Sequence, residues 1–295
     1  MKSQVYEERW RLESVIDKIN PQNCHADQNA ASEQRTESQS GRWVLQNDDF
    51  QAWRNVNNAS SNPLLYINGI PGAGIDFNQI LRFLRVYSQL MDEGKTVLAS
   101  LIIETLLKQD NIPVLFFYCK HRQQEKSTFA GILRGLLAQI IPKDATLVSW
   151  FGERCSSLDR QKLGSPEILE ELARFAFNSQ RISLVVLDGL DECNAEEIKK
   201  TISWFVSYQG ANHTGTGQIR LMCIGQRIDI LQTMLASATS ISLDNSCHRD
   251  DIAKYVVGKT RNIQEKFKIK PDTFSQISFR VMKTAKGSIL FYIRF

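Results

Sequence analysis

Short apolar segments alternate with segments of helical spacing through the middle of this chain. The short apolar segments lie at 64–67, 114–118, 182–187, 219–224 and 240–243, and the helical spacing is found at 95–108, 128–141, 166–178 and 195–207. Fully apolar strands separated by helices are typical of a parallel sheet covered on both faces. The pattern therefore predicts a three-layer α/β fold with a mostly parallel sheet.

The two ends of the chain depart from this alternation. Residues 5–19 predict a short amphipathic helix, and the polar stretch 20–42 predicts a linker or a loosely packed strap. Trp43 and Trp53 are expected to be packing anchors where the core begins. After residue 249 the pattern is helical only, at about 250–262 and 271–286. We therefore divide the chain into an N-terminal helix with a polar linker, an α/β core and a partial helical subdomain, at residues 1–42, 43–249 and 250–295.

A phosphate-binding sequence is present in two halves. A P-loop reads G-x-x-x-x-G-K-[ST] between a strand and a helix: its backbone N–H groups surround phosphate oxygens, its lysine neutralises charge and its hydroxyl holds Mg²⁺. The first half follows an apolar strand and supplies Gly69, Gly72, Ala73 and Gly74, but Ile75 stands where lysine is required. The missing Lys95-Thr96 pair comes later, at the start of an apolar helix.

The intervening segment, residues 75–94, has apolar residues at helical spacing and leaves three explanations open. It is an in-frame retained intron or gene-model error, or a real insertion that extrudes and lets Lys95 return to the phosphates, or a real insertion that abolishes binding. Without this segment the sequence reads as an uninterrupted strand, loop and helix with every required residue.

A second motif carries acidic residues. The strand 184–187 ends in Asp188-Gly-Leu-Asp191-Glu192, and in P-loop proteins such a strand places its terminal aspartate beside Mg²⁺. The next acids, Asp191 and Glu192, can orient the attacking water or act as a base, although an acidic turn that caps the next helix would look the same. Arg227 follows the next strand and is a candidate contact for the γ-phosphate, with a surface arginine as the alternative.

Composition and charge limit which classes of protein this chain can belong to. With 36 basic and 32 acidic residues the net charge is +4, which does not indicate nucleic-acid binding. No apolar run reaches the roughly 18 residues of a membrane span, and the N-terminus has no apolar signal core. The six cysteines are far apart and the four histidines lack metal spacing, so we expect reduced thiols in a cytoplasmic protein.

The motifs resemble the NACHT branch of the STAND signal-transduction NTPases, in the form abundant in filamentous fungi and akin to the nephrocystin-type N-terminal domain. The resemblance runs from about residue 20 to 287 and rests on Trp43, Phe50 to Trp53, Ile67 to Gly74 with Lys95-Thr96, Phe116 to Cys119, Leu133 to Gln139, Val186 to Cys193, Arg227 and Asp251 to Val256.

The resemblance implies a P-loop NTPase core that switches between states on exchange and slow hydrolysis of ATP or GTP, with homo-oligomers formed by full-length relatives. It implies that Gly69, Gly72, Ala73, Gly74, Lys95 and Thr96 bind phosphate, that Thr96 and Asp188 hold Mg²⁺, that Asp191 and Glu192 serve hydrolysis and that Arg227 senses the γ-phosphate.

The chain departs from the family at two places. The split loop leaves open whether it binds and hydrolyses nucleotide. The residues after Gly287 read SILFYIRF in place of a winged-helix region and a repeat array, so we expect a truncated switch core. The alternative function is a non-catalytic interaction or remnant protein that keeps the fold without binding nucleotide. A processive AAA-type ATPase is disfavoured.

Overall fold

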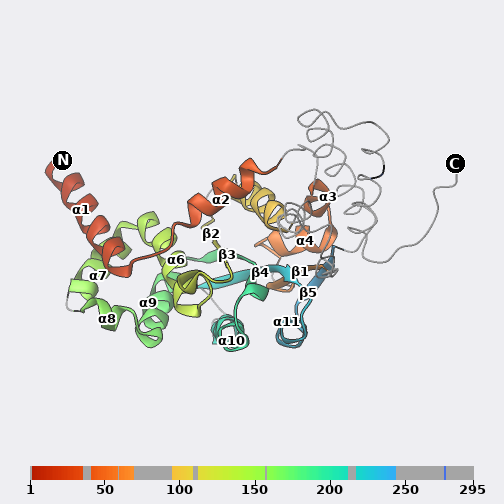
Figure 1. Ribbon diagram of the computed structural model, residues 1–295. Coiled ribbons are helices and arrows are strands. Elements are labelled where there is room, and N and C mark those ends of the chain that lie inside the picture. The colour runs from red at the N-terminus through yellow and green to blue at the C-terminus, as the bar shows by residue number, and fades with distance from the viewer. Residues whose placement is uncertain are drawn as a thin grey trace.

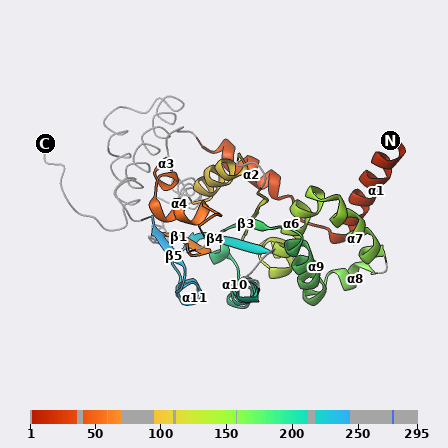
Figure 2. The same ribbon diagram turned by 180° about the vertical axis from the view of Figure 1, so that it is seen from behind.

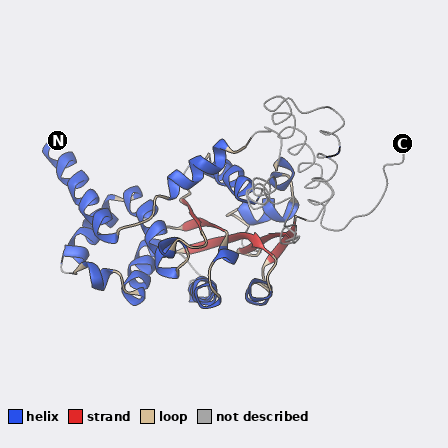
Figure 3. Ribbon diagram, viewed as in Figure 1, coloured by secondary structure: helices blue, strands red, loops and turns tan. Residues whose placement is uncertain are grey.

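The computed structural model describes residues 2–35, 41–58, 60–69, 95–108, 112–156, 158–211, 217–243 and the single residue 276. These residues fold around one five-stranded sheet in the order β2-β3-β4-β1-β5, in which every pair of neighbouring strands is parallel (Figures 1 and 3). The strands are β1 (Leu64–Gly69), β2 (Val114–Tyr118), β3 (Ile182–Asp188), β4 (Gln218–Gln226) and β5 (Thr239–Ser242). The predicted α/β fold with a parallel sheet is confirmed.

The helices form a layer on each face of the sheet and a group at one end. They are α1 (Lys2–Ile19), α2 (Cys24–Glu33), α3 (Arg42–Leu45), α4 (Asp48–Arg54), residues 95–107, α6 (Phe129–Ile140), α7 (Ala145–Ser156), α8 (Arg160–Leu163), α9 (Pro166–Asn178), α10 (Ala195–Ala211) and α11 (Asp229–Met234). Seen from both sides, α1 lies with α7, α8 and α9 beyond the β2 end of the sheet (Figures 1 and 2).

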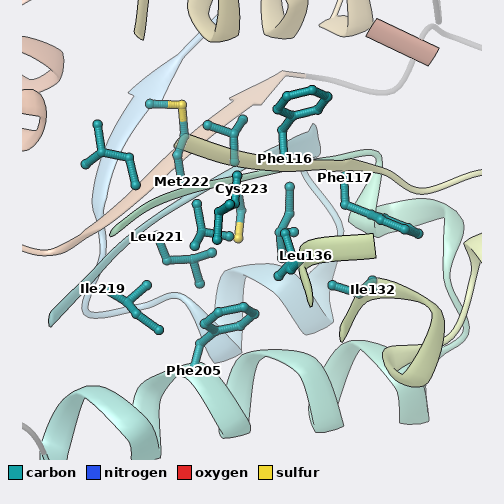
Figure 4. Close-up of a cluster of buried hydrophobic side chains, with 14 of the residues drawn as sticks. Phe116, Phe117, Ile132, Leu136, Phe205, Ile219, Leu221, Met222 and Cys223 are labelled. Carbon is teal, nitrogen blue, oxygen red and sulfur yellow. The ribbon is translucent and has the colours of Figure 1, made fainter. Parts of the chain in front are cut away.

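Alternate strand residues face the two helical layers, as the pleat of a strand requires. In β2 the ring of Phe116 meets His25 of α2 edge to face, whereas Phe117 lies against Gly135 of α6. In β4, Leu221 points with Ile219 and Cys223 toward Phe205 of α10, and Met222 points the other way (Figure 4). All of these strand side chains are buried, so the core is continuous on both faces of the sheet.

The outer edge of β2 is covered by a side chain of α6. The amide of Gln139 accepts a hydrogen bond from the Phe116 N–H at 3.1 Å and donates to the Phe116 carbonyl at 2.8 Å. It also donates to the Gly135 carbonyl within its own helix. Gln139 therefore replaces a neighbouring strand for one residue of β2 and satisfies backbone groups that are buried there.

Trp53 confirms the expected anchor at the start of the core. Its side chain is buried, and its Nε1–H donates to the Pro63 carbonyl just before β1. The buried guanidinium of Arg220 in β4 donates to the carbonyls of Trp53, at 2.8 Å, and of Asn58, at 2.7 Å. These bonds fix α4 and the turn after it on the sheet, and Trp43 packs partly buried against the same core.

The expectation of a linker or a loosely packed strap is wrong for residues 24–33, which form α2. Asn23 caps this helix by accepting a hydrogen bond from the Ala26 N–H. The helix buries Asp27, whose carboxylate is bound by Lys120 and Lys126, both at 2.6 Å. Its polar composition hid it, because these buried polar groups are stabilised by distant partners and not by apolar packing.

Most other elements lie where the sequence predicts them. The bounds of α9 and β2 agree with the expected ranges, and residues 95–107 are helical from Lys95 onward. Helices α7, α8 and α11 were not expected. The helix predicted at 250–262 lies outside the described residues, and of the helix predicted at 271–286 only residue 276 is described, as helical. No helix in the described part of the chain is both long enough and apolar enough to cross a bilayer.

Candidate phosphate and magnesium site

The strand ends that carry the candidate residues meet at one edge of the sheet. The register pairs Asp188 with Tyr118 on one side and Ile224 on the other. Asn68 of β1 is paired with Gly225 of β4 and with Ser242 of β5. Since all five strands are parallel, these residues form one row at their carboxyl ends, where open α/β sheets bind ligands.

The first described turn of the helical residues 95–107 lies at this same edge. Thr96 Oγ1 donates a hydrogen bond to Asp188 Oδ2 at 2.7 Å. Lys95 is half-buried beside it, and the charge of its ammonium acts on the Asp188 carboxyl. The second half of the split motif and the acidic strand thus come together, as their predicted roles require.

Asp188 is a buried acid in a crowded electrostatic position. Its side chain is only 3% exposed, and burial raises its pKa to about 7. The hydrogen bond from Thr96 lowers the pKa and the carboxylate of Asp191 raises it, while Lys95 lowers it and Glu192 raises it. A desolvated carboxylate next to two other acids is stabilised by a cation, so this edge favours a positive ion.

The oxygen atoms of Thr96 and Asp188 fit a magnesium ion. Adjacent ligands of an octahedral Mg²⁺ at 2.0–2.1 Å lie about 2.9 Å apart, close to the 2.7 Å between these two oxygens. Mg²⁺ is usually bound by one or two protein oxygens together with phosphates and water. Among the described residues no group of three or more His, Cys, Asp or Glu side chains could hold a metal, so an all-protein metal cage is not found there.

The turn after β3 sends Asp191 and Glu192 in different directions. Asp191 packs against Gly225, where any Cβ would collide with its Oδ1 atom. Asp191 also acts on Tyr66 of β1: burial raises the pKa of this phenol, and the carboxylate raises it further. Glu192 instead accepts a hydrogen bond from the backbone N–H of His121, after β2, at 2.6 Å. Asp191 therefore faces the strand before the glycine-rich loop, and Glu192 faces the loop after β2.

The turn itself depends on Gly189. This residue has φ +72°, in the left-handed region, and a Cβ there would lie 2.9 Å from the Cys119 carbonyl oxygen. Its N–H donates to the Ile224 carbonyl at 2.9 Å. A glycine at this position is what lets the acidic turn close tightly over the ends of β2 and β4.

Arg227 lies at the opposite side of the site, over the ends of β1 and β5. Its Nε and Nη2 atoms donate to Asn68 Oδ1 at 2.9 and 2.8 Å, and Nη2 also lies 3.2 Å from Ser242 Oγ. Its backbone N–H donates to the Gly69 carbonyl. Arg227 is thus attached to the strand end from which the glycine-rich loop begins.

Ten residues were predicted for this site, and the structure describes seven of them at this edge of the sheet. One is Gly69 at the end of β1. The other six are Lys95, Thr96, Asp188, Asp191, Glu192 and Arg227; the remaining three, Gly72, Ala73 and Gly74, lie outside the described residues. Sequence reasoning assigned no role to Asn68 or Gly225. The signal for Asn68 was available, because it is a lone amide in an apolar strand directly before Gly69.

A family model matches the middle part of the chain. The family described as Nephrocystin 3, N-terminal matches residues 91–225. The matched region begins near the end of the intervening segment and includes Lys95, Thr96 and the acidic turn, whereas β1 and Gly69 to Gly74 lie before it. The chain is therefore similar to nephrocystin-type N-terminal domains over its middle part. None of the curated proteins compared with the chain matches it.

Proposed function

We propose that this chain is the nucleotide-binding core of a signalling switch of the STAND/NACHT type, which takes ATP or GTP with Mg²⁺. The observation that carries the proposal is the 2.7 Å contact between Thr96 and Asp188 at the carboxyl edge of a parallel sheet. A helix hydroxyl and a buried acid at the end of a strand are the oxygen pair that a Mg²⁺-nucleotide needs.

The proposed roles follow from where each side chain lies. Thr96 and Asp188 would hold the metal, which when bound supplies positive charge to the phosphates. Lys95, one residue before Thr96, contributes its ammonium to the same region, and Arg227 contributes a guanidinium from the β1 side. Asp191 and Glu192 would accept a proton from water or orient it during slow hydrolysis.

The intervening segment does not by itself argue against this function. Gly69 ends β1, and Thr96, in the helical residues 95–107, lies at the same edge of the sheet, in a chain that includes residues 75–94. This arrangement favours an extruded insertion over one that abolishes binding. Whether the mature message encodes the segment is answered by sequencing the transcript across codons 70 to 100.

One feature of the sequence supports the second candidate function. The glycines of the loop and the lysine are separated by twenty residues in this sequence, and a P-loop needs them in one continuous turn. The alternative is therefore a non-catalytic interaction protein with the same fold. The assembly of homo-oligomers and a cytoplasmic location belong to the first proposal; the described cysteines, all free and buried, are compatible with a reducing compartment.

Nucleotide binding by the full chain tests the proposal. Binding of ATP and of GTP is measured by calorimetry, with Mg²⁺ and with EDTA. We expect Mg²⁺-dependent binding that is lost in Lys95→Ala and kept in Lys199→Ala, an exposed lysine of α10 that serves as the matched control. A chain that binds neither nucleotide, while deletion of residues 75–94 restores binding, would establish the remnant function for the chain as written.

A further inference from the structure

Helix α2 and the acidic turn are connected by the loop from Lys120 to Lys126, which follows β2. The Lys120 N–H donates to the Lys126 carbonyl at 3.1 Å, so the loop closes on itself. The next N–H along the loop, that of His121, donates to Glu192 of the acidic turn at 2.6 Å. The side chains of both lysines contact Asp27 of α2. One loop therefore contacts both the acidic turn and α2.

Asp27 holds both ends of this loop with one carboxylate. Its Oδ1 atom lies 2.6 Å from Lys120 Nζ, and Lys126 Nζ lies 2.6 Å from Oδ2 and 2.9 Å from Oδ1. The side chains of Asp27 and Lys126 are only 9% and 12% exposed, so this ion pair is largely removed from water, where charges interact more strongly. Without the carboxylate the two ammonium groups repel each other, which drives the ends of the loop apart.

The position of Glu192 depends on this loop. Its side chain is exposed, so packing does not confine it, and polar contacts determine where its carboxylate lies. The His121 N–H supplies one of these contacts, from the residue directly after Lys120. A displacement of Lys120 therefore moves a group that bonds to Glu192. The hydrogen bond between Thr96 and Asp188 does not involve the loop.

We propose that Asp27 is a positioning residue for hydrolysis: by holding both ends of the loop, it places the His121 N–H and thereby the carboxylate of Glu192. The inference rests on the proposed nucleotide-binding function and deepens it, because it makes hydrolysis, but not binding, depend on helix α2. Asp27 has no contact with the nucleotide in this proposal; it acts through the loop and Glu192.

A purely structural role for Asp27 predicts something different. Helix α2 also bonds to the helical residues 95–107, through Gln28 and the Ser100 carbonyl. If the ion pairs only hold α2 in place, their loss lowers the free energy of unfolding and weakens nucleotide binding and hydrolysis together. If Asp27 positions Glu192, its loss slows hydrolysis of bound nucleotide and leaves the affinity unchanged. The comparison of rate with affinity therefore separates the two roles.

The experiment compares two substitutions in the full chain. Asp27→Asn keeps the shape of the side chain and removes the charge that the two lysines share. Glu33→Gln makes the same change of charge at an exposed position of the same helix and is the matched control. The affinities for Mg²⁺-ATP and Mg²⁺-GTP are measured by calorimetry, and the hydrolysis rate is measured in single turnover with protein in excess.

A third measurement reports on the loop without any nucleotide. Selective nitrogen-15 labelling of histidine restricts the backbone NMR spectrum to the four histidines of the chain. The His121 amide signal is assigned from its disappearance in His121→Gln. Glu192→Ala removes the acceptor and so gives the signal of the amide without this hydrogen bond.

We expect Asp27→Asn to lower the single-turnover rate about tenfold and to keep the affinity within twofold, while Glu33→Gln changes neither. The His121 amide signal should shift in Asp27→Asn in the same direction as in Glu192→Ala. In a Glu192→Ala background, Asp27→Asn should not slow the residual hydrolysis further, because Asp27 acts through Glu192.

The outcomes that overturn the inference are distinct from those that overturn the function. An unaltered chain that does not bind nucleotide, or binds it without hydrolysing it, removes the proposed function and this inference with it. An unchanged rate in Asp27→Asn, a rate and affinity that fall together, or an unmoved His121 signal removes the inference alone. If Asp27→Asn does not fold, the same measurements on Lys126→Met, which removes one ion pair and keeps that of Lys120, decide the question.

Discussion

The hydroxyl of Thr96 lies 2.7 Å from the carboxylate of Asp188, although 92 residues separate them along the chain and β4 lies between β1 and β3. This contact holds the first described turn of the helical residues 95–107 against the end of the acidic strand. It also means that the two halves of the split motif end on the same edge of the sheet, with Gly69 at the end of β1.

Replacing the Thr96 hydroxyl should remove magnesium-dependent nucleotide binding. Thr96→Val keeps the shape of the side chain and loses the oxygen, so we expect at least a tenfold loss of affinity, which corresponds to about 1.4 kcal/mol. Thr96→Ser should retain binding within a few-fold. Thr105→Val in the same helix, where the hydroxyl bonds only to the Leu101 carbonyl, is the control. Equal affinities for Thr96→Val and the unaltered chain, measured by calorimetry, would contradict the assignment.

The buried carboxyl of Asp188 should make the metal-free protein less stable as pH rises. Burial raises its pKa from 3.8 to about 7, so the folded state holds this proton more tightly than the unfolded state. The stabilisation that this bound proton gives to the folded state is complete below about pH 4 and is lost as pH rises through about 7. We expect a loss on the order of a few kcal/mol between pH 4 and 8, measured by urea unfolding in EDTA.

The control for this pH dependence is Asp188→Asn, which keeps an acceptor for Thr96 and cannot ionise. Its free energy of unfolding should vary less with pH over the same interval, despite the nearby Asp191, Glu192 and Lys95. Mg²⁺ should restore stability at pH 8 to the unaltered chain and not to the variant. Identical pH profiles for both proteins would show that the Asp188 carboxyl is not the titrating group.

Most of the fold could be predicted because strands β1 to β4 are short and mainly apolar. Val114–Tyr118 is the clearest case: five consecutive apolar residues, all buried, with both faces covered. Helix α2 could not be predicted in this way. Its buried residues include Asp27 and Gln28, which are stabilised by partners about 70 to 100 residues away in sequence. Hydrophobic patterning carries no information about such polar contacts.

The site was predictable to the extent that its residues belong to sequence motifs. The spacing of Lys95-Thr96 before an apolar helix, and of Asp188 at the end of an apolar strand, indicated their positions. The orientation of Asp191 toward Gly225 and of Glu192 toward His121 depends on the left-handed turn at Gly189, which spacing does not reveal. The positions of the residues that support the site, such as Gly225, depend on strand order and register, which spacing along the sequence does not reveal either.

The α2 helix should stabilise the helix that carries Thr96. Gln28 is buried, accepts a hydrogen bond from the Tyr118 hydroxyl and donates to the Ser100 carbonyl at 3.0 Å. Gln28→Leu leaves the Tyr118 hydroxyl without this acceptor, which should cost about 1–3 kcal/mol. Hydrogen exchange should then be faster for backbone amides of residues 95–107. Gln232→Leu, at an exposed position of α11, should change neither quantity; equal exchange in both variants would contradict the link.

Gly225 should be required for the position of Asp191, and its substitution should separate binding from hydrolysis. A Cβ at Gly225 would collide with the Asp191 carboxylate, so Gly225→Ala must displace that side chain while Thr96 and Asp188 stay in place. We expect Mg²⁺-nucleotide affinity within a few-fold of the unaltered chain and a single-turnover hydrolysis rate at least tenfold lower, if Asp191 serves the attacking water.

Gly152 provides the matched control for this substitution. It lies inside α7, and a Cβ there would have no atom within 4 Å. Gly152→Ala should therefore stabilise the protein by roughly 0.5–1 kcal/mol, because alanine loses less backbone freedom in a helix, and should leave hydrolysis unchanged. A hydrolysis rate in Gly225→Ala equal to that of Gly152→Ala would exclude Asp191 from the reaction and leave Glu192, bound to the His121 N–H, as the acid to test next.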